Sequence, residues 1–221
     1  MSNAASFSRV SLYKKCPASY EWQYVLGNKE AFSPGPAAER GTRIHNSIED
    51  YFLDRGPLDP EVPDKFVTLF SQMKDSGNHT QVLPEHPFAL TDKWEPTQFD
   101  ADDAWVRGLM DNMFVYEDRL LIHEYKTGQE YPEHADQKQL YAMVGLILYP
   151  EFDSVEVQGV YIDGKKIIPT VYSRGHLQSM KFVWERQIKK MALPLYPARP
   201  GMHCRWCPKS SKKEGGSCPL G

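Results

Sequence analysis

The sequence predicts an α/β (α+β) fold in which a mixed central sheet is flanked by helices and followed by a C-terminal Cys-rich module. Apolar side chains recur at helical spacing in the first third of the chain and again at 133–149 and 176–192. Strand-like runs fill most of 81–172. Helices and strands in this order pack most simply as one sheet with helices on its faces.

Two helical regions are expected before the sheet begins. The first covers 8–25 and breaks at Cys16-Pro17, because proline cannot continue a helix. The second covers 38–54, where Ile44, Ile48 and Phe52 recur every fourth residue. A third helix is expected around Phe66–Met73, which has the same apolar spacing.

The expected strands alternate with turns and with one long helix. They are 81–90, 104–116, 119–126, 154–162 and 166–172. The helix at 133–149 separates the third strand from the fourth. Asp163-Gly164 favours a tight hairpin between the last two strands. Pro194, Pro197 and Pro200 end regular structure before the tail.

The composition narrows the class of protein. The 221 residues contain 41% hydrophobic side chains, enough for a substantial core. The net charge of −3 excludes a generally cationic nucleic-acid coat but permits a local basic patch. Four cysteines are too few for a secreted disulfide scaffold. The longest apolar run, 141–149, is too short for a membrane span. We therefore expect a soluble intracellular protein with no membrane partner.

The residues best suited to catalysis are concentrated in the second and third expected strands. If Glu117-Asp118 forms a two-residue turn, Asp111 lies directly opposite Glu124, since facing residue numbers sum to 235. Opposed residues share a face, and Lys126, two residues beyond Glu124, lies on that face too. Two carboxylates this close repel each other unless a cation lies between them. Mg²⁺ or Mn²⁺ suits such oxygen ligands.

A plainer reading of the same residues is an exposed hairpin face with a cross-strand ion pair. The chain contains three acid-x-Lys triplets, ending at Lys126, Lys138 and Lys165, so the triplet alone is weak. A register slip of one residue would also separate Asp111 from Glu124.

Other candidate residues lie on the helices and on the first strand. His45 and Glu49 are four residues apart and share a helical face, as do Gln137 and Tyr141. The latter pair could hold a nucleotide or a water molecule. Glu85 is one more candidate inward-facing acid. For each of these, an ordinary surface or helix-boundary residue is the alternative.

The cysteines predict a second metal site. Cys204, Cys207 and Cys218 lie within fifteen residues, and Cys16 is the remaining cysteine. Four thiolates suit either Zn²⁺ or an iron–sulfur cluster, and His203 could replace one of them at zinc. Free thiols are the alternative.

The tail also concentrates positive charge. Arg205, Lys209, Lys212 and Lys213 are candidate phosphate contacts for DNA, and a solvated charge run is the alternative. Trp22, Trp206 and Tyr13 are candidate stacking surfaces for bases, or else core aromatics.

Taken in order, these segments resemble the RecB-like branch of the PD-(D/E)XK nuclease superfamily. That branch includes CRISPR-associated RecB-like nucleases and small phage and bacterial exonucleases with an iron–sulfur cluster. The resemblance covers nearly the whole chain. It rests on the Ser-Phe-Ser…Cys-Pro…Tyr opening at 6–24, Gly41-Thr42 with His45 and Glu49, Gly108 with Asp111, Glu124-Tyr125-Lys126-Thr127-Gly128, Gln137 with Tyr141, and the Cys-rich tail.

The resemblance implies a role for each matching residue and a restriction-endonuclease-like fold. The implied metal ligands are His45, Asp111, Glu124 and the Tyr125 carbonyl. Lys126 is the implied catalytic lysine, and Glu124 stands where some members have Asp. The implied helical pair near the DNA is Gln137 and Tyr141, with Glu49 and Glu85 as accessory acids. The implied ligands of a 4Fe–4S cluster are Cys16, Cys204, Cys207 and Cys218.

The expected function is therefore that of a Mg²⁺- or Mn²⁺-dependent DNA exonuclease acting in replication, recombination or repair. Its expected partners are DNA with a free end or a single strand, and replication or recombination proteins. The resemblance also implies a cytoplasmic location in a bacterial or phage-infected cell. The expected domains are a nuclease core at 1–198 and a metal-cluster module at 199–221 closed by Cys16. The alternatives are a non-catalytic DNA-binding or processing subunit with a structural metal site, and a zinc-stabilised endonuclease or nickase.

Overall fold

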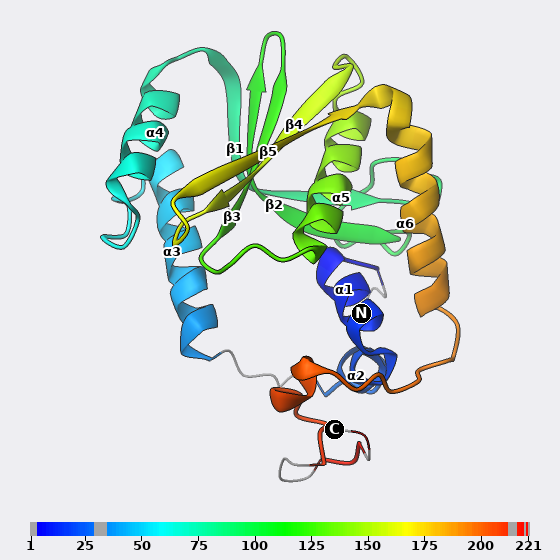
Figure 1. The fold of residues 1–221 in the computed structure, drawn as a ribbon. Helices are drawn as coiled ribbons and strands as arrows, with labels where there is room; N and C mark the ends of the chain where they lie inside the picture. The colour runs from blue at the N-terminus through cyan, green and yellow to red at the C-terminus, as the bar shows by residue number, and fades with distance from the viewer. Residues whose placement is uncertain (1–3, 29–34, 212–215, 219, 221) are drawn as a thin grey trace. The chain divides into compact units, whose positions relative to one another are not determined.

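The computed structural model describes residues 4–28, 35–211, 216–218 and 220 and divides the chain into two compact units (Figure 1). The first unit contains Ala4 and Gly35–Phe182, and the second contains Ala5–Pro34 and Val183–Gly221. The units differ from the division at 198/199, which stays a prediction, although both groupings place Cys16 with the C-terminal cysteines.

The elements follow the predicted order closely. The first unit contains α3 (Pro36–Phe52), α4 (Asp64–Asp75), β1 (His79–Leu90), β2 (Val106–Tyr116), β3 (Leu120–Lys126), α5 (Glu133–Leu148), β4 (Ser154–Tyr161), β5 (Lys166–Ser173) and a 3-10 turn (Arg174–His176). The boundary between the units falls within α6 (Leu177–Met191). The second unit contains α1 (Phe7–Lys15), α2 (Pro17–Tyr20), a π-helical turn (Glu21–Val25) and a 3-10 turn (Met202–Arg205).

The five described strands form one mixed sheet in the order β1-β2-β3-β4-β5. Neighbouring strands are antiparallel except β3 and β4, which are parallel and are connected through α5. A parallel pair needs such a crossover, because a short turn cannot return the chain to the same end of the sheet. The predicted mixed sheet with flanking helices is confirmed.

The β2–β3 hairpin has the predicted register. Tyr116 donates its backbone N–H to the Arg119 carbonyl over 2.9 Å, which places Glu117-Asp118 in the turn. Asn112 then pairs with His123, one step before Asp111 and Glu124. The pairing sum is 235 throughout this hairpin, so no register slip separates the two acids.

The β4–β5 hairpin differs in its turn. Tyr161 pairs with Lys166, so the connection contains four residues, 162–165, with Asp163-Gly164 at its centre. The positive φ of 48° falls on Lys165 rather than on Gly164. A two-residue turn of the preferred kind needs positive φ at both central positions. The sequence signal therefore located the hairpin but not its turn type.

Helices cover both faces of the sheet. The apolar stripe of α3 packs with Phe66 and Phe70 of α4 on one face, in a core that includes Phe114, Leu121 and Tyr125 of β2 and β3. α5 covers the other face, where a Cβ at Gly145 would lie 3.1 Å from Leu120. Strand β3 is buried along most of its length because both of its faces are covered.

The second unit is built around the break that the sequence predicts at Cys16-Pro17. Cys16 has an extended backbone (φ −155°) between α1 and α2, and Pro17 begins α2 at a position that tolerates proline. Tyr20 contacts the rings of Tyr13, Tyr24 and Tyr196, which joins this segment to the chain after α6.

None of the helices among the described residues combines the length and apolar character that crossing a bilayer requires.

Candidate active site

Two strand carboxylates form the floor of the candidate site. Asp111 of β2 and Glu124 of β3 are neighbours across the hairpin, as the register requires. The Tyr125 backbone N–H donates to Asp111 Oδ2 over 2.7 Å and fixes that side chain. Glu124 is 3% exposed, and its Oε2 has no hydrogen-bond partner among the described residues.

Two further side chains reach Asp111 from other elements. His45 of α3 places its Nδ1 3.6 Å from Asp111 Oδ2, one turn before the partly buried Glu49. Glu85 lies opposite Asp111 in the β1–β2 ladder and has a left-handed backbone conformation, with φ +44°. Ligand atoms of His45, Glu85 and Asp111 all lie within 4.8 Å of one another. The structure thus brings together three candidate ligands that are far apart in the sequence.

His45 also contacts the strand backbone. Its ring lies edge-on to that of Tyr125, with centroids 5.9 Å apart, and the Tyr125 backbone partly offsets the lowering of the His45 pKa by burial. Tyr125, whose carbonyl is the predicted fourth ligand, therefore lies next to the predicted histidine ligand.

The buried carboxyls are electrostatically strained. Burial raises the pKa of Asp111 to about 7, against the opposing pull of the Lys126 charge. Burial and the neighbouring Asp111 charge raise the pKa of Glu124 to about 7. The pKa of Glu85 is raised by burial, by Glu49 and by Glu124. The charge of Glu85 therefore opposes ionisation of Asp111, that of Asp111 opposes ionisation of Glu124, and that of Glu124 opposes ionisation of Glu85.

Two basic side chains complete the site. Burial alone would lower the pKa of Lys126, but Glu124 and Asp111 outweigh it, and the net shift is upward. Lys126 Nζ lies 2.5 Å from Glu124 Oε1, and its side chain stays 24% exposed. Burial lowers the pKa of His45, which favours the neutral imidazole that binds metal ions.

The residues present fit a divalent cation. Four acids (Glu49, Glu85, Asp111 and Glu124) are accompanied by two cations, Lys126 and Arg55. Buried carboxylate oxygens beside a neutral imidazole are the ligands that Mg²⁺ and Mn²⁺ accept. A bound dication would remove the excess negative charge and give the unpartnered Glu124 oxygen a ligand.

An open pocket lies over this cluster. Its lining residues are Gly41, Thr42, His45, Asn46, Glu49 and Glu85. Glu49 is held by Arg55, whose Nη2 lies 2.6 Å from Glu49 Oε1. Sequence reasoning missed Arg55, because only the left-handed turn at Asp54 (φ 58°) brings it back toward the helix.

Gln137 and Tyr141 lie behind the strand acids rather than in the open pocket. Tyr141 donates its hydroxyl to the Leu109 carbonyl over 2.7 Å and accepts a 3.0 Å hydrogen bond from Gln137 Nε2. Both side chains are buried. These contacts brace β2 two residues before Asp111, and a direct contact with DNA stays a prediction.

The four cysteines gather in the second unit. All four are free, and all line one pocket. The backbone N–H of Arg199 lies 3.5 Å from Cys16 Sγ, and that of Gly201 lies 3.4 Å from Cys204 Sγ. A backbone bridge between Ser210 and Cys218 returns the last cysteine to the same place. Thiolates with N–H donors suit a bound metal centre.

The predicted basic residues of the tail differ in position. Arg205 is exposed, whereas the Lys209 side chain is 17% exposed, lines the cysteine pocket and lies 3.9 Å from Glu21. Lys212 and Lys213 lie outside the described residues.

Comparison with known proteins agrees with this geometry. The family profile of the PD-(D/E)XK nuclease superfamily matches residues 4–211. No curated protein matches the chain. A solved structure from Eubacterium rectale named "Putative exonuclease" has a TM-score of 0.55 at 11% identity, covering 90% of this chain and 85% of that one. The structure of SSO0001 has a TM-score of 0.49 at 12% identity, covering 100% and 88%. By the family match, the chain belongs to the PD-(D/E)XK nuclease superfamily.

Proposed function

We propose that this protein is a Mg²⁺- or Mn²⁺-dependent DNA exonuclease of the RecB-like branch, acting in replication, recombination or repair. The observation that carries the proposal is the convergence of His45, Glu85 and Asp111 beside the Glu124–Lys126 pair. A non-catalytic DNA-binding subunit would not need a catalytic lysine paired with a buried acid beside an open pocket.

The proposed role of each side chain follows from its position. His45, Asp111, Glu124 and the Tyr125 carbonyl would hold the cation, with Glu85 beside them. A bound divalent cation activates water and neutralises phosphate charge. In phosphodiester hydrolysis, water attacks phosphorus in line with the leaving 3′ oxygen. Lys126, partly exposed beside Glu124, donates hydrogen bonds to that water or to a non-bridging phosphate oxygen.

The choice of exonuclease over endonuclease draws on the name of the E. rectale protein and on the branch that the motifs resemble. The test uses end-labelled linear DNA, both single- and double-stranded, beside circular single-stranded and nicked DNA, with Mg²⁺, Mn²⁺ or EDTA. We expect metal-dependent degradation of linear DNA and intact circles. Cleavage of circles at the same rate would establish an endonuclease or nickase instead.

The matched variants are Glu124→Gln, Lys126→Ala and Asp118→Asn. Glu124→Gln and Lys126→Ala should remove cleavage while circular dichroism shows a folded protein. Asp118→Asn, in the exposed β2–β3 turn, should cleave like wild type. Wild-type rates from Glu124→Gln would overturn the assignment of the site, and absence of cleavage by wild type would favour the non-catalytic alternative.

For the cysteine pocket we propose a structural 4Fe–4S cluster held by Cys16, Cys204, Cys207 and Cys218. All four cysteines line one pocket, and the resemblance to nucleases with an iron–sulfur cluster favours the cluster over zinc. Protein purified without oxygen should be brown, absorb near 400 nm and contain iron and sulfide. Stoichiometric zinc in a colourless protein would refute the cluster.

The basic tail gives the proposed exonuclease a second contact with DNA. Arg205 is the best placed of these side chains because it is exposed. Arg205→Ala should weaken DNA binding and reduce its salt dependence by about one counterion. If the dependence of DNA affinity on salt concentration is unchanged, the tail charges contact solvent rather than DNA.

A further inference from the structure

The connection between β3 and α5 forms part of the rim of the candidate active site. It begins directly after Lys126 and ends before the helix that carries Gln137. A Cβ on Gly41, which lines the open pocket, would lie 3.2 Å from Thr127 Oγ1. The first residue of the connection therefore contacts the pocket wall.

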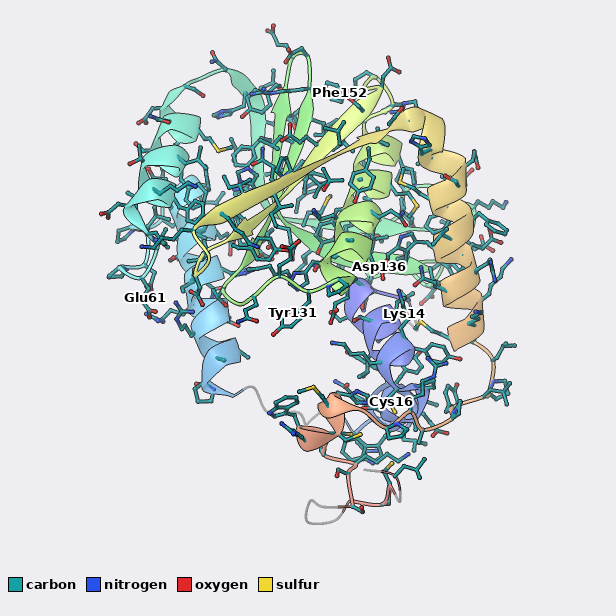
Figure 2. The ribbon with its side chains drawn as sticks, viewed as in Figure 1. Lys14, Cys16, Glu61, Tyr131, Asp136 and Phe152 are labelled. Atoms are coloured by element: carbon teal, nitrogen blue, oxygen red, sulfur yellow. The ribbon has the colours of Figure 1, made fainter. Side chains whose placement is uncertain are left out.

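Tyr131 lies on this connection (Figure 2). The residue is 51% exposed, although tyrosine rings in this protein are mostly packed against other side chains. Tyr131 is five positions after Lys126 in the chain, which limits the distance between their Cα atoms to about 18 Å. A nucleotide against this ring would lie within a few nucleotides of the reacting phosphate.

The ring is held in place from one side. His134 meets it edge-on, with ring centroids 5.6 Å apart and an interplanar angle of 89°. His134 stacks in turn on Tyr161, and its Nδ1 lies 3.0 Å from the Tyr161 hydroxyl. Tyr161 is 1% exposed at the end of β4. Two ring contacts, Tyr131–His134 and His134–Tyr161, thus connect Tyr131 to the sheet and reduce the conformational freedom that binding would remove.

We propose that Tyr131 stacks on an unpaired base of the DNA strand that enters the active site. Every base presents a π-face, so this contact carries no sequence preference. Within a duplex those faces are covered by neighbouring bases, and only a single strand or a frayed end offers one. The inference rests on the proposed nuclease function and specifies its substrate class as DNA with unpaired bases at the site.

The first test measures binding of a fluorescently labelled single-stranded oligonucleotide, with Ca²⁺ in place of the catalytic cation. Stacking on an aromatic side chain contributes about 1–3 kcal/mol per base, so Tyr131→Ala should weaken binding roughly 5- to 150-fold. Tyr131→Phe should bind within about twofold of wild type because it keeps the ring. Blunt duplex DNA should show no difference between these proteins.

The matched control is Tyr149→Ala. Tyr149 directly follows the C-terminus of α5, whereas Tyr131 precedes its N-terminus, and the sixteen residues of the helix separate them by about 24 Å. The control should bind single strands like wild type, because it removes the same side chain far from the pocket.

The second test replaces one base at a time in the oligonucleotide with an abasic residue. One position near the end should weaken wild-type binding at least fivefold and leave Tyr131→Ala binding unchanged. The inference is overturned if Tyr131→Ala binds single strands like wild type, if Tyr131→Phe loses as much as Tyr131→Ala, or if duplex binding falls equally. These outcomes are separate from failure of the proposed function, in which wild type itself neither binds nor cleaves DNA.

Discussion

Replacing Asp111 by Asn should stabilise the metal-free protein at alkaline pH while abolishing cleavage. The carboxyl is 13% exposed, and burial raises its pKa to about 7. In the unfolded chain, the pKa of an aspartate side chain is about 3.9. Between these values the folded state binds more protons than the unfolded state, so the free energy of unfolding falls as pH rises from about 4 to 7. Above pH 7 the full cost of the buried charge remains.

The size of the effect follows from the shift. About three pKa units at roughly 1.4 kcal/mol each give an upper value of about 4 kcal/mol. Asparagine keeps an oxygen that accepts the 2.7 Å hydrogen bond from the Tyr125 N–H. It also removes the charge that raises the pKa of Glu124. Lost attraction to Lys126 offsets part of the gain, and we expect about 2–4 kcal/mol at pH 8 and almost none at pH 4.

The assay is thermal unfolding in EDTA across pH 4–8. A gain of 2–4 kcal/mol corresponds to a rise in Tm of roughly 4–16 °C for a chain of this length. Added Mn²⁺ should stabilise wild type and not the variant, because wild type alone keeps all the ligands that we propose for the cation.

The control is Asp118→Asn in the exposed turn of the same hairpin, which should change stability by less than about 0.5 kcal/mol at any of these pH values. Equal stability of Asp111→Asn and wild type at pH 8 in EDTA would show that the Asp111 charge is not strained. If Asp111→Asn were less stable than wild type by several kcal/mol at pH 8, the Asp111 charge would likewise not be strained.

Three further predictions concern packing and hydrogen bonding. Gly145→Val should lower stability by about 1–3 kcal/mol, because even a Cβ there lies 3.1 Å from Leu120; an unchanged Tm would contradict the close approach of α5. Tyr141→Phe should cost about 1–2 kcal/mol in urea unfolding, since it leaves the Leu109 carbonyl without its 2.7 Å donor, and a neutral result would place water there. Phe70→Ala should cost about 3–5 kcal/mol by opening a cavity between α4 and the sheet, whereas a loss below 1 kcal/mol would contradict its complete burial.

The local pattern of the sequence was sufficient to predict the helices and strands. It was also sufficient to predict that Asp111 and Glu124 lie side by side in the candidate site. Helical spacing of Ile44, Ile48 and Phe52 predicts the buried stripe of α3, because that periodicity is a property of the helix alone. The Asp111–Glu124 pair is also local, since one short turn fixes the register of the whole hairpin. Such inferences need only neighbours in the chain.

Turn type and ion pairing were less predictable. Asp163-Gly164 indicates a hairpin, yet the left-handed residue is Lys165. Arg40 of α3 forms hydrogen bonds of 3.2 and 2.9 Å with Asp163, and this tertiary contact accompanies the longer turn. Likewise, Arg55 meets Glu49 only because the chain reverses at Asp54. Neither pair has a sequence pattern of its own.

The sequence by itself determined that this chain forms a mixed sheet with helices and that two acids and a lysine share one face of a hairpin. The tertiary structure decided that His45 and Glu85, from a helix and from another strand, meet Asp111 within 4.8 Å, and that an exposed Tyr131 stands at the rim. The physical reason is that periodicity and turn chemistry act over a few residues. Which distant elements share a pocket depends instead on how the whole core packs.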